Sequence, residues 1–118
     1  SNFDAAKNLN LLIVGDGDVK YKEELYKLVT KHGLCERVFF LGWKSSAETL
    51  HLIQGATCLV MISKFENFGI AALEAVLLGT KVIISDGVGA SEYLLENFCE
   101  LVTVVHNELE IRRALDEI

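Results

Sequence analysis

Short apolar runs alternate with helix-like segments five times along this chain. The apolar runs are expected to form strands, at residues 9–14, 37–41, 57–62, 81–85 and 100–105. The segments after them carry helical periodicity or capping signals, at residues 18–32, 45–54, 68–78, 90–97 and from 107 to the chain end. Strands that read as continuous apolar runs are typical of parallel sheets with helices on both faces. Because such alternation favours parallel pairing with right-handed crossovers, the order predicts an α/β fold.

Capping residues predict where several helices begin and end. Gly33 follows the first helical segment and is a candidate C-cap. Ser45-x-x-Glu48 and Asn107-x-x-Glu110 have the spacing of capping boxes, which predict the starts of the second and last helices. Together with the strand pattern, these signals predict a Rossmann-like three-layer αβα domain with a mainly parallel five-stranded sheet.

The size and charge of the chain narrow the kinds of partner that it can have. Its 118 residues suit one domain, so we expect a single domain over residues 1–118. The formal net charge of −6 argues against nucleic acid or an anionic membrane as the partner. A small anionic ligand stays open, because backbone amides bind phosphate without net positive charge. The three cysteines have no metal-site spacing, which predicts reduced thiols in a cytoplasmic protein without a metal.

The carboxyl ends of the expected strands mark the candidate ligand site, because ligands bind outside this edge in open parallel sheets. The segments that should gather there are residues 15–17, 42–44, 63–69, 86–89 and His106. Gly15-x-Gly17 begins like a dinucleotide-binding fingerprint, but Lys20 stands where the third glycine belongs. A nicotinamide or flavin dinucleotide site is therefore not expected. An ordinary tight turn and a loop that approaches a phosphate or sugar both stay open for this segment.

Two glutamates frame the start of the third expected helix. Glu66 lies in the loop before it, and Gly69 leaves room for a phosphate at the free amides of the helix terminus. Glu74 lies about 7–8 Å farther along the helix axis, near the separation of a diphosphate from the ribose hydroxyls. Because burying an unpartnered carboxylate is costly, Glu74 should have donors or border a cleft. An ordinary capped loop and an outward-facing Glu74 are the alternatives.

The segment FENFGIAALEAVLLGTKVIISDGVGASEYL resembles the signature of the family-4 glycosyltransferases of the GT-B fold. That signature is E-x-F-G-x-x-x-x-E-A, then G-x-P-V-I, then a glycine turn and a glutamate. The residues in matching places are Glu66, Phe68, Gly69, Glu74, Ala75, Gly79, Val82, Ile83, Gly89 and Glu92. Upstream, LLIVGDG, RVFFLGW and ATCLVMIS resemble the preceding strands of that family's C-terminal domain.

The resemblance implies a site for a nucleotide-diphosphate sugar, from which family members transfer a hexosyl group with retention, usually without a metal and without a cofactor. It implies that Glu66 is the catalytic residue, at the hydroxyls of the transferred sugar, and that Glu74 binds the ribose. It also implies donor contacts for Gly15, Trp43, Lys44, Asn67, Phe68, Gly69 and Ile70. The residues themselves leave open whether Trp43 is a stacking surface or a core anchor.

The resemblance covers only one part of a GT-B enzyme. In the family, the donor domain begins with a further strand, whose loop carries an Arg and a Lys for the diphosphate, and an N-terminal domain binds the acceptor. We therefore expect residues 1–118 to be a truncated C-terminal donor-binding domain that is inactive alone. Without the further strand, direct pairing of the first and third strands gives the order 2-1-3-4-5. Lys81, Val88 and Ser91 replace a proline, a glycine and a proline of the signature.

The expected setting is the cytoplasm, with no membrane contact for this domain, in a full-length protein that can lie peripherally at the membrane and serve cell-surface polysaccharide biosynthesis. Two other classes of protein stay open. A non-catalytic flavodoxin-like or receiver-type binding module has the same strand order, but the third strand ends Ile62-Ser63 without a phosphoacceptor aspartate. A GT-B sugar-nucleotide epimerase shares the shape, although the E-x7-E spacing with Phe-Gly favours the transferase.

Overall fold

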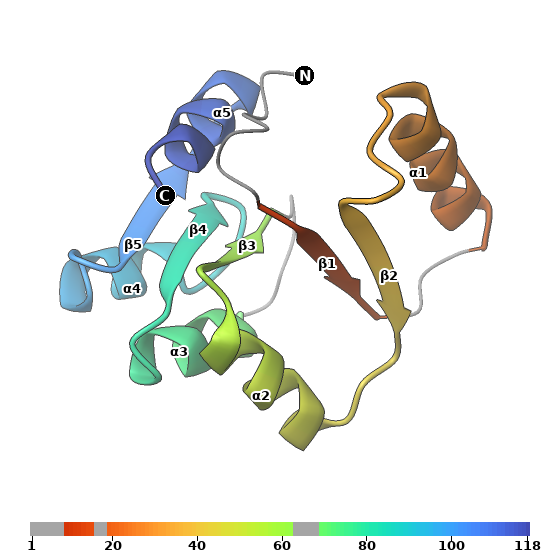
Figure 1. Ribbon diagram of the computed structural model, residues 1–118. Helices are drawn as coiled ribbons and strands as arrows, with labels where there is room; N and C mark the ends of the chain where they lie inside the picture. The colour runs from red at the N-terminus through yellow and green to blue at the C-terminus, as the bar shows by residue number, and fades with distance from the viewer. Residues whose placement is uncertain (1–8, 16–18, 63–68) are drawn as a thin grey trace. The chain divides into compact units, whose positions relative to one another are not determined.

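The computed structural model describes residues 9–15, 19–62 and 69–118 (Figure 1). Strands and helices alternate through them: β1 (Leu11–Val14), α1 (Val19–Lys31), β2 (Val38–Gly42), α2 (Ser46–Gly55), β3 (Cys58–Met61), α3 (Ile70–Leu77), β4 (Lys81–Ser85), α4 (Ser91–Asn97), β5 (Val102–Val105) and α5 (Glu108–Asp116). The predicted order is therefore confirmed, with ends that move by at most two residues. The chain forms two compact units, residues 1–49 and 50–118, and each is described by itself.

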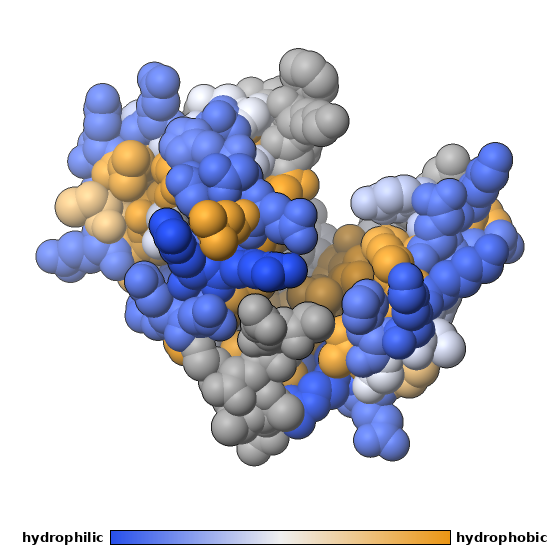
Figure 2. Space-filling view, turned by 90° about the horizontal axis from the view of Figure 1, so that it is seen from above, coloured by the Kyte–Doolittle hydropathy of each residue, from blue (hydrophilic) through white to orange (hydrophobic). Residues whose placement is uncertain are grey.

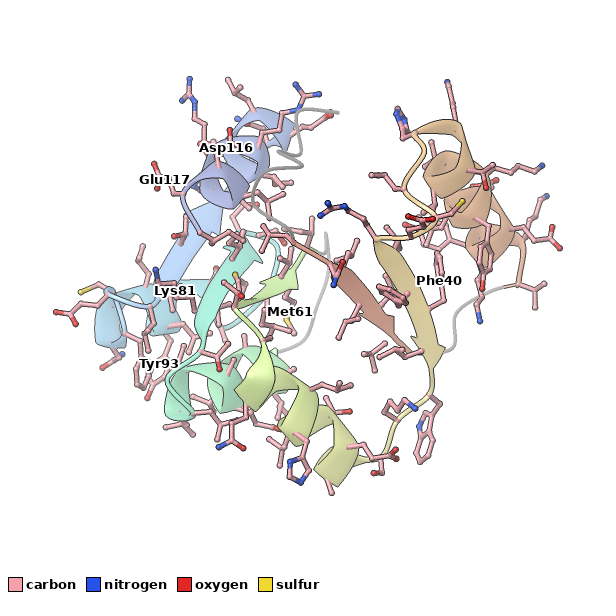
Figure 3. The ribbon with its side chains drawn as sticks, in the orientation of Figure 1. Phe40, Met61, Lys81, Tyr93, Asp116 and Glu117 are labelled. Carbon is pink, nitrogen blue, oxygen red and sulfur yellow. The ribbon has the colours of Figure 1, made fainter. Side chains whose placement is uncertain are left out.

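In the first unit, β1 and β2 form a parallel pair. The register shifts by one residue at Val14, which pairs with Gly42. The helix α1 packs on this pair through the rings of Tyr26 and Phe40, whose centroids are 4.2 Å apart (Phe40 is labelled in Figure 3). Gly33 follows the end of α1 and has φ +67°, the left-handed conformation that is typical of a glycine at a helix C-terminus. The C-cap predicted at this glycine is therefore confirmed.

In the second unit, β3, β4 and β5 form a parallel three-stranded sheet in that order. The register pairs Met61 with Ile84 and Ser85 with Val105. The carboxyl ends of all three strands therefore lie at one edge of this sheet. Parallel neighbours of this kind need helical crossovers, which α3 and α4 supply.

Helices cover both faces of the three-stranded sheet (Figure 1). The core on one face joins β4 and β5 to α3 and α4, and its buried residues are Ile53, Ala72, Ala75, Val76, Val82, Ile84, Val88, Ala90, Leu94 and Val102. On the other face, Ile83 and Val105 pack against Ala114 of α5. Consecutive residues of β4 thus point to opposite faces, as the two-residue period of a strand requires. The outer surface on the α5 side is largely hydrophilic (Figure 2). The predicted αβα layering is confirmed in this unit.

The predicted strand order is confirmed only in its two parts. Hydrogen bonds join β1 to β2 and join β3, β4 and β5 in sequence, as the order 2-1-3-4-5 requires. Each ladder belongs to one unit, so the single five-stranded sheet with the order 2-1-3-4-5 stays a prediction. The apolar pattern shows that a segment becomes a strand, but it carries no information about which other strand lies beside it.

Side-chain hydrogen bonds confirm the predicted caps. Ser45 N donates to Glu48 Oε1 at 3.1 Å, and Glu48 N donates to Ser45 Oγ at 3.2 Å, which completes the capping box of α2. Asn107 Oδ1 accepts from Glu110 N at 2.9 Å at the start of α5. Glu110 departs from the capping-box pattern. Its Oε1 accepts, at 2.9 Å, from the backbone N of His106, which is the residue before the N-cap Asn107.

Candidate functional site

The candidate site begins at the start of α3, where Gly69 is the N-cap residue. Gly69 is buried and has φ +88° and ψ +53°, a left-handed conformation that glycine adopts without a steric penalty. Its carbonyl oxygen accepts from the backbone N of Ala72 at 3.0 Å and of Leu73 at 3.2 Å. The amides before Ala72 have no carbonyl partner in the preceding turn of the helix, as at every helix start. This terminus is suited to bind an anion such as phosphate.

Glu74 lies on α3 about one and a half turns beyond Gly69. It is half-buried, and the structure shows no hydrogen bond or ion pair of its carboxylate with the described residues. A helix as apolar as α3 is usually buried on most faces, but α3 is buried on only part of its surface. The helix buries Ala72, Ala75 and Val76, whereas Ile70 and Leu77 are 65% and 69% exposed. The difference arises because one face of the helix packs on the sheet.

Asp86 and His106 meet at the ends of the two neighbouring strands β4 and β5. His106 Nδ1 lies 3.0 Å from Asp86 Oδ2, and both side chains are more than half exposed. The hydrogen bond to Asp86 raises the pKa of His106, and the negative charge of Glu110 acts in the same direction. Glu110 also accepts a hydrogen bond from the backbone of His106. The contact with Asp86 therefore favours the protonated form of the His106 ring at the carboxyl edge of the sheet.

The predicted site residues of the first unit lie at the ends of its two strands. Gly15 follows β1 with φ +117°, and its N donates to Gly42 O at 2.8 Å. Trp43 follows β2 and is 69% exposed, so its ring is not a core anchor in this structure. Lys44 comes next and is half-buried. Their donor contacts stay predictions.

The structure describes only some of the site residues that the sequence predicts. Glu66, Asn67 and Phe68 lie outside the described residues, so the roles predicted for them are not tested. The structure places Ile70 and Glu74 on α3 and Gly69 at its N-cap, and the ligand contacts of all three stay predictions. Sequence reasoning placed His106 at the sheet edge but missed its pairing with Asp86. The available signal was that each residue directly follows one of two adjacent apolar strands.

Residues 9–15, 19–62 and 69–118 contain no group of three or more His, Cys, Asp or Glu side chains placed to hold a metal ion. Over the same residues, every helix is too short or too polar to cross a membrane.

Residues 2–118 match the family described as glycosyl transferases group 1. An uncharacterized glycosyltransferase of Methanocaldococcus jannaschii is 38% identical over 89 residues, which are 74% of this chain and 22% of that protein. The D-inositol 3-phosphate glycosyltransferase of Nocardia farcinica is 28% identical over 115 residues, which are 95% of this chain and 26% of the relative.

A solved structure has the same fold as this chain. The crystal structure of the Anabaena protein HepE in complex with UDP and glucose matches with a TM-score of 0.78 and 25% identity. The match covers 98% of this chain and 33% of HepE. The chain thus spans between 22% and 33% of the length of these three proteins. Because the family match covers almost every residue, the chain belongs to the group 1 glycosyl transferases.

Proposed function

We propose that this chain binds the nucleotide-diphosphate sugar of a glycosyltransferase, through the start of α3. The observation that carries the proposal is the position of Gly69, which opens α3 at the carboxyl edge of the sheet with Glu74 about one and a half turns farther on. Family membership and a structural relative whose crystals contain UDP and glucose support the same assignment.

The proposed roles follow from the chemistry of each group. The free amides after Gly69 bind the diphosphate, and the helix dipole adds about 0.3–1 kcal/mol for each favourably placed charge. The Glu74 carboxylate accepts hydrogen bonds from the two ribose hydroxyls, which gives this half-buried group the donors that it lacks among the described residues. Glu66 as the catalytic residue, and the contacts of Asn67, Phe68 and Ile70, rest on the sequence resemblance.

The activity of the whole protein is a wider proposal. We infer transfer of a hexosyl group with retention to an acceptor that another domain binds, in the cytoplasm, without a metal or cofactor. The contributions of Gly15, Trp43 and Lys44 to the base and phosphates belong to this wider proposal. Determining the anomeric configuration of the product of the full-length protein tests retention, and an inverted product would contradict it.

Ligand-observed NMR on the 118-residue chain tests the binding proposal. UDP-, GDP- and ADP-glucose are titrated in turn, and the expected result is saturable binding of one nucleotide in preference to the others. Glu74→Ala should abolish this binding, because the ribose hydroxyls lose their acceptor. Glu100→Ala is the matched control, since it removes an exposed carboxylate outside α3 and should leave the affinity unchanged.

The outcomes separate the two parts of the proposal. Binding that Glu74→Ala leaves intact refutes the ribose role and keeps the phosphate role of the α3 terminus. Equal loss in the Glu74→Ala and Glu100→Ala variants indicates an effect of net charge rather than of the site. Failure of all three nucleotide sugars to bind contradicts the proposal that this chain binds the donor by itself.

A further inference from the structure

The side chains of Met61 and Val88 lie where a side chain at residue 69 would begin. A Cβ atom added to Gly69 would lie 2.7 Å from Val88 Cγ1 and 3.3 Å from Met61 Sδ. Met61 is the last residue of β3 (Figure 3), and Val88 lies in the loop after β4. Because real Cβ atoms do not approach other atoms to 2.7 Å, no side chain fits at residue 69 while Val88 keeps its place.

Packing, rather than a side-chain cap, fixes the start of α3 in the described structure. Gly69 has no side chain, and the N-cap of α3 shows no side-chain hydrogen bond. At α5, by contrast, the Asn107 side chain accepts from Glu110 N and anchors the helix start. The position of the first amides of α3 therefore depends on what holds Gly69 in place.

Val88 is itself firmly held. Its side chain is 1% exposed and belongs to the core cluster between the sheet and α3. Its backbone N donates to Ser85 O at 3.1 Å, and its carbonyl accepts from Ser91 N at 3.0 Å. At the start of the loop, Asp86 N donates to Val105 O at 3.1 Å, which ties the loop to β5. These hydrogen bonds fix the backbone of the loop and thereby the position of the Val88 side chain beside Gly69.

We propose that Val88 is a positioning residue for the nucleotide-sugar site, because its Cγ1 methyl sets the depth at which Gly69 and the first amides of α3 lie. This inference rests on the proposed function. Backbone amides that bind one diphosphate move together, so a shift of Gly69 alters all of their hydrogen bonds at once.

A double-mutant cycle tests the contact without any ligand. Gly69→Ala raises the unfolding equilibrium constant, measured by urea denaturation, through left-handed backbone strain and the clash with Val88. In a Val88→Ala background the strain and the Met61 contact remain, but the clash is relieved. The rise should then be about tenfold smaller than in wild type. Val102→Ala is the matched control, because Val102 is a buried valine of the same core at the opposite end of the sheet. Gly69→Ala should have its full effect in that background.

A binding measurement then tests the positioning role. Val88→Ala should weaken UDP-glucose binding about tenfold, while Val102→Ala changes it less than twofold. The proposal is overturned if Val88→Ala leaves UDP-glucose binding unchanged. It is also overturned if Gly69→Ala has the same effect on unfolding in the Val88→Ala background as in wild type. Equal weakening in both variants also overturns it, because general loss of core packing then explains the effect. If the wild-type chain binds no nucleotide sugar, the proposed function fails and Val88 has no site to position.

Discussion

His106 Nδ1 lies 3.0 Å from Asp86 Oδ2, between residues that directly follow the adjacent strands β4 and β5. The contact joins two loops at the edge of the sheet where the candidate site lies. The charge of the His106 ring depends on pH, because histidine side chains titrate near neutral pH and the pKa of His106 is raised.

The Asp86–His106 pair should make stability depend on pH in one direction. Because the folded-state pKa of His106 is raised by the Asp86 hydrogen bond, the pair stabilises the fold fully below the ordinary histidine pKa. This contribution is lost as the pH rises through the raised pKa. We expect the difference in unfolding free energy between wild type and Asp86→Asn to shrink across this window, measured by urea denaturation at several pH values.

NMR titration of the His106 ring gives a direct check. Asp86→Asn should lower the midpoint of the His106 titration, because it removes the acceptor that favours the charged ring. Glu108→Gln is the control, since Glu108 is a nearby carboxylate that pairs with Arg112 instead, at 3.8 Å. Equal midpoints for wild type and Asp86→Asn would show that the Asp86 contact does not set the pKa of His106.

The capping box of α2 predicts an effect at acid pH. Two hydrogen bonds from Ser45 lower the pKa of Glu48, the larger effect coming from the backbone N and the smaller from the side chain. The resulting stabilisation is present above the ordinary glutamate pKa and is lost as the pH falls through the lowered one. Ser45→Ala should raise the pKa of Glu48 only partway, because the backbone donor remains. Carbon-detected NMR of the carboxyl group measures this, and Ser46→Ala should change nothing.

Thr80 should stabilise the second unit through one buried hydrogen bond. Its Oγ1 donates to Ile53 O at 3.0 Å, and the side chain is buried. Thr80→Val keeps the shape and should cost about 1 kcal/mol of unfolding free energy. The cost stays small because Ala56 N also donates to Ile53 O. Thr103→Val, at an exposed position of β5, should change stability by less than about 0.5 kcal/mol.

Burial should separate two apolar residues of similar size. Ile84 on β4 is 0% exposed, and Leu77 on α3 is 69% exposed. Ile84→Ala should lower the unfolding free energy by about 2–5 kcal/mol, because it leaves a cavity in the core. Leu77→Ala should change it by no more than about 0.5 kcal/mol. Urea denaturation followed by circular dichroism compares the two, and similar losses would mean that Leu77 is covered in solution.

The order of the strands and helices, and their ends to within two residues, could be predicted from the amino-acid sequence because these signals are local. The capping boxes at Ser45 and Asn107 and the C-cap at Gly33 each act within a few residues of the chain, and all three are present in the structure. The family signature was likewise readable, because it is a spacing along one segment, and it led to the family that the comparisons confirm.

The contacts between residues far apart in the chain could be seen only in the folded structure. The pairing of Asp86 with His106 depends on the register of β4 and β5, and the seat of Gly69 against Val88 depends on how α3 packs on the sheet. The folded structure also shows that β1 pairs with β2 while β3, β4 and β5 form their own ladder. Local patterns could not give these results, because register and packing arise from contacts between segments far apart in the chain.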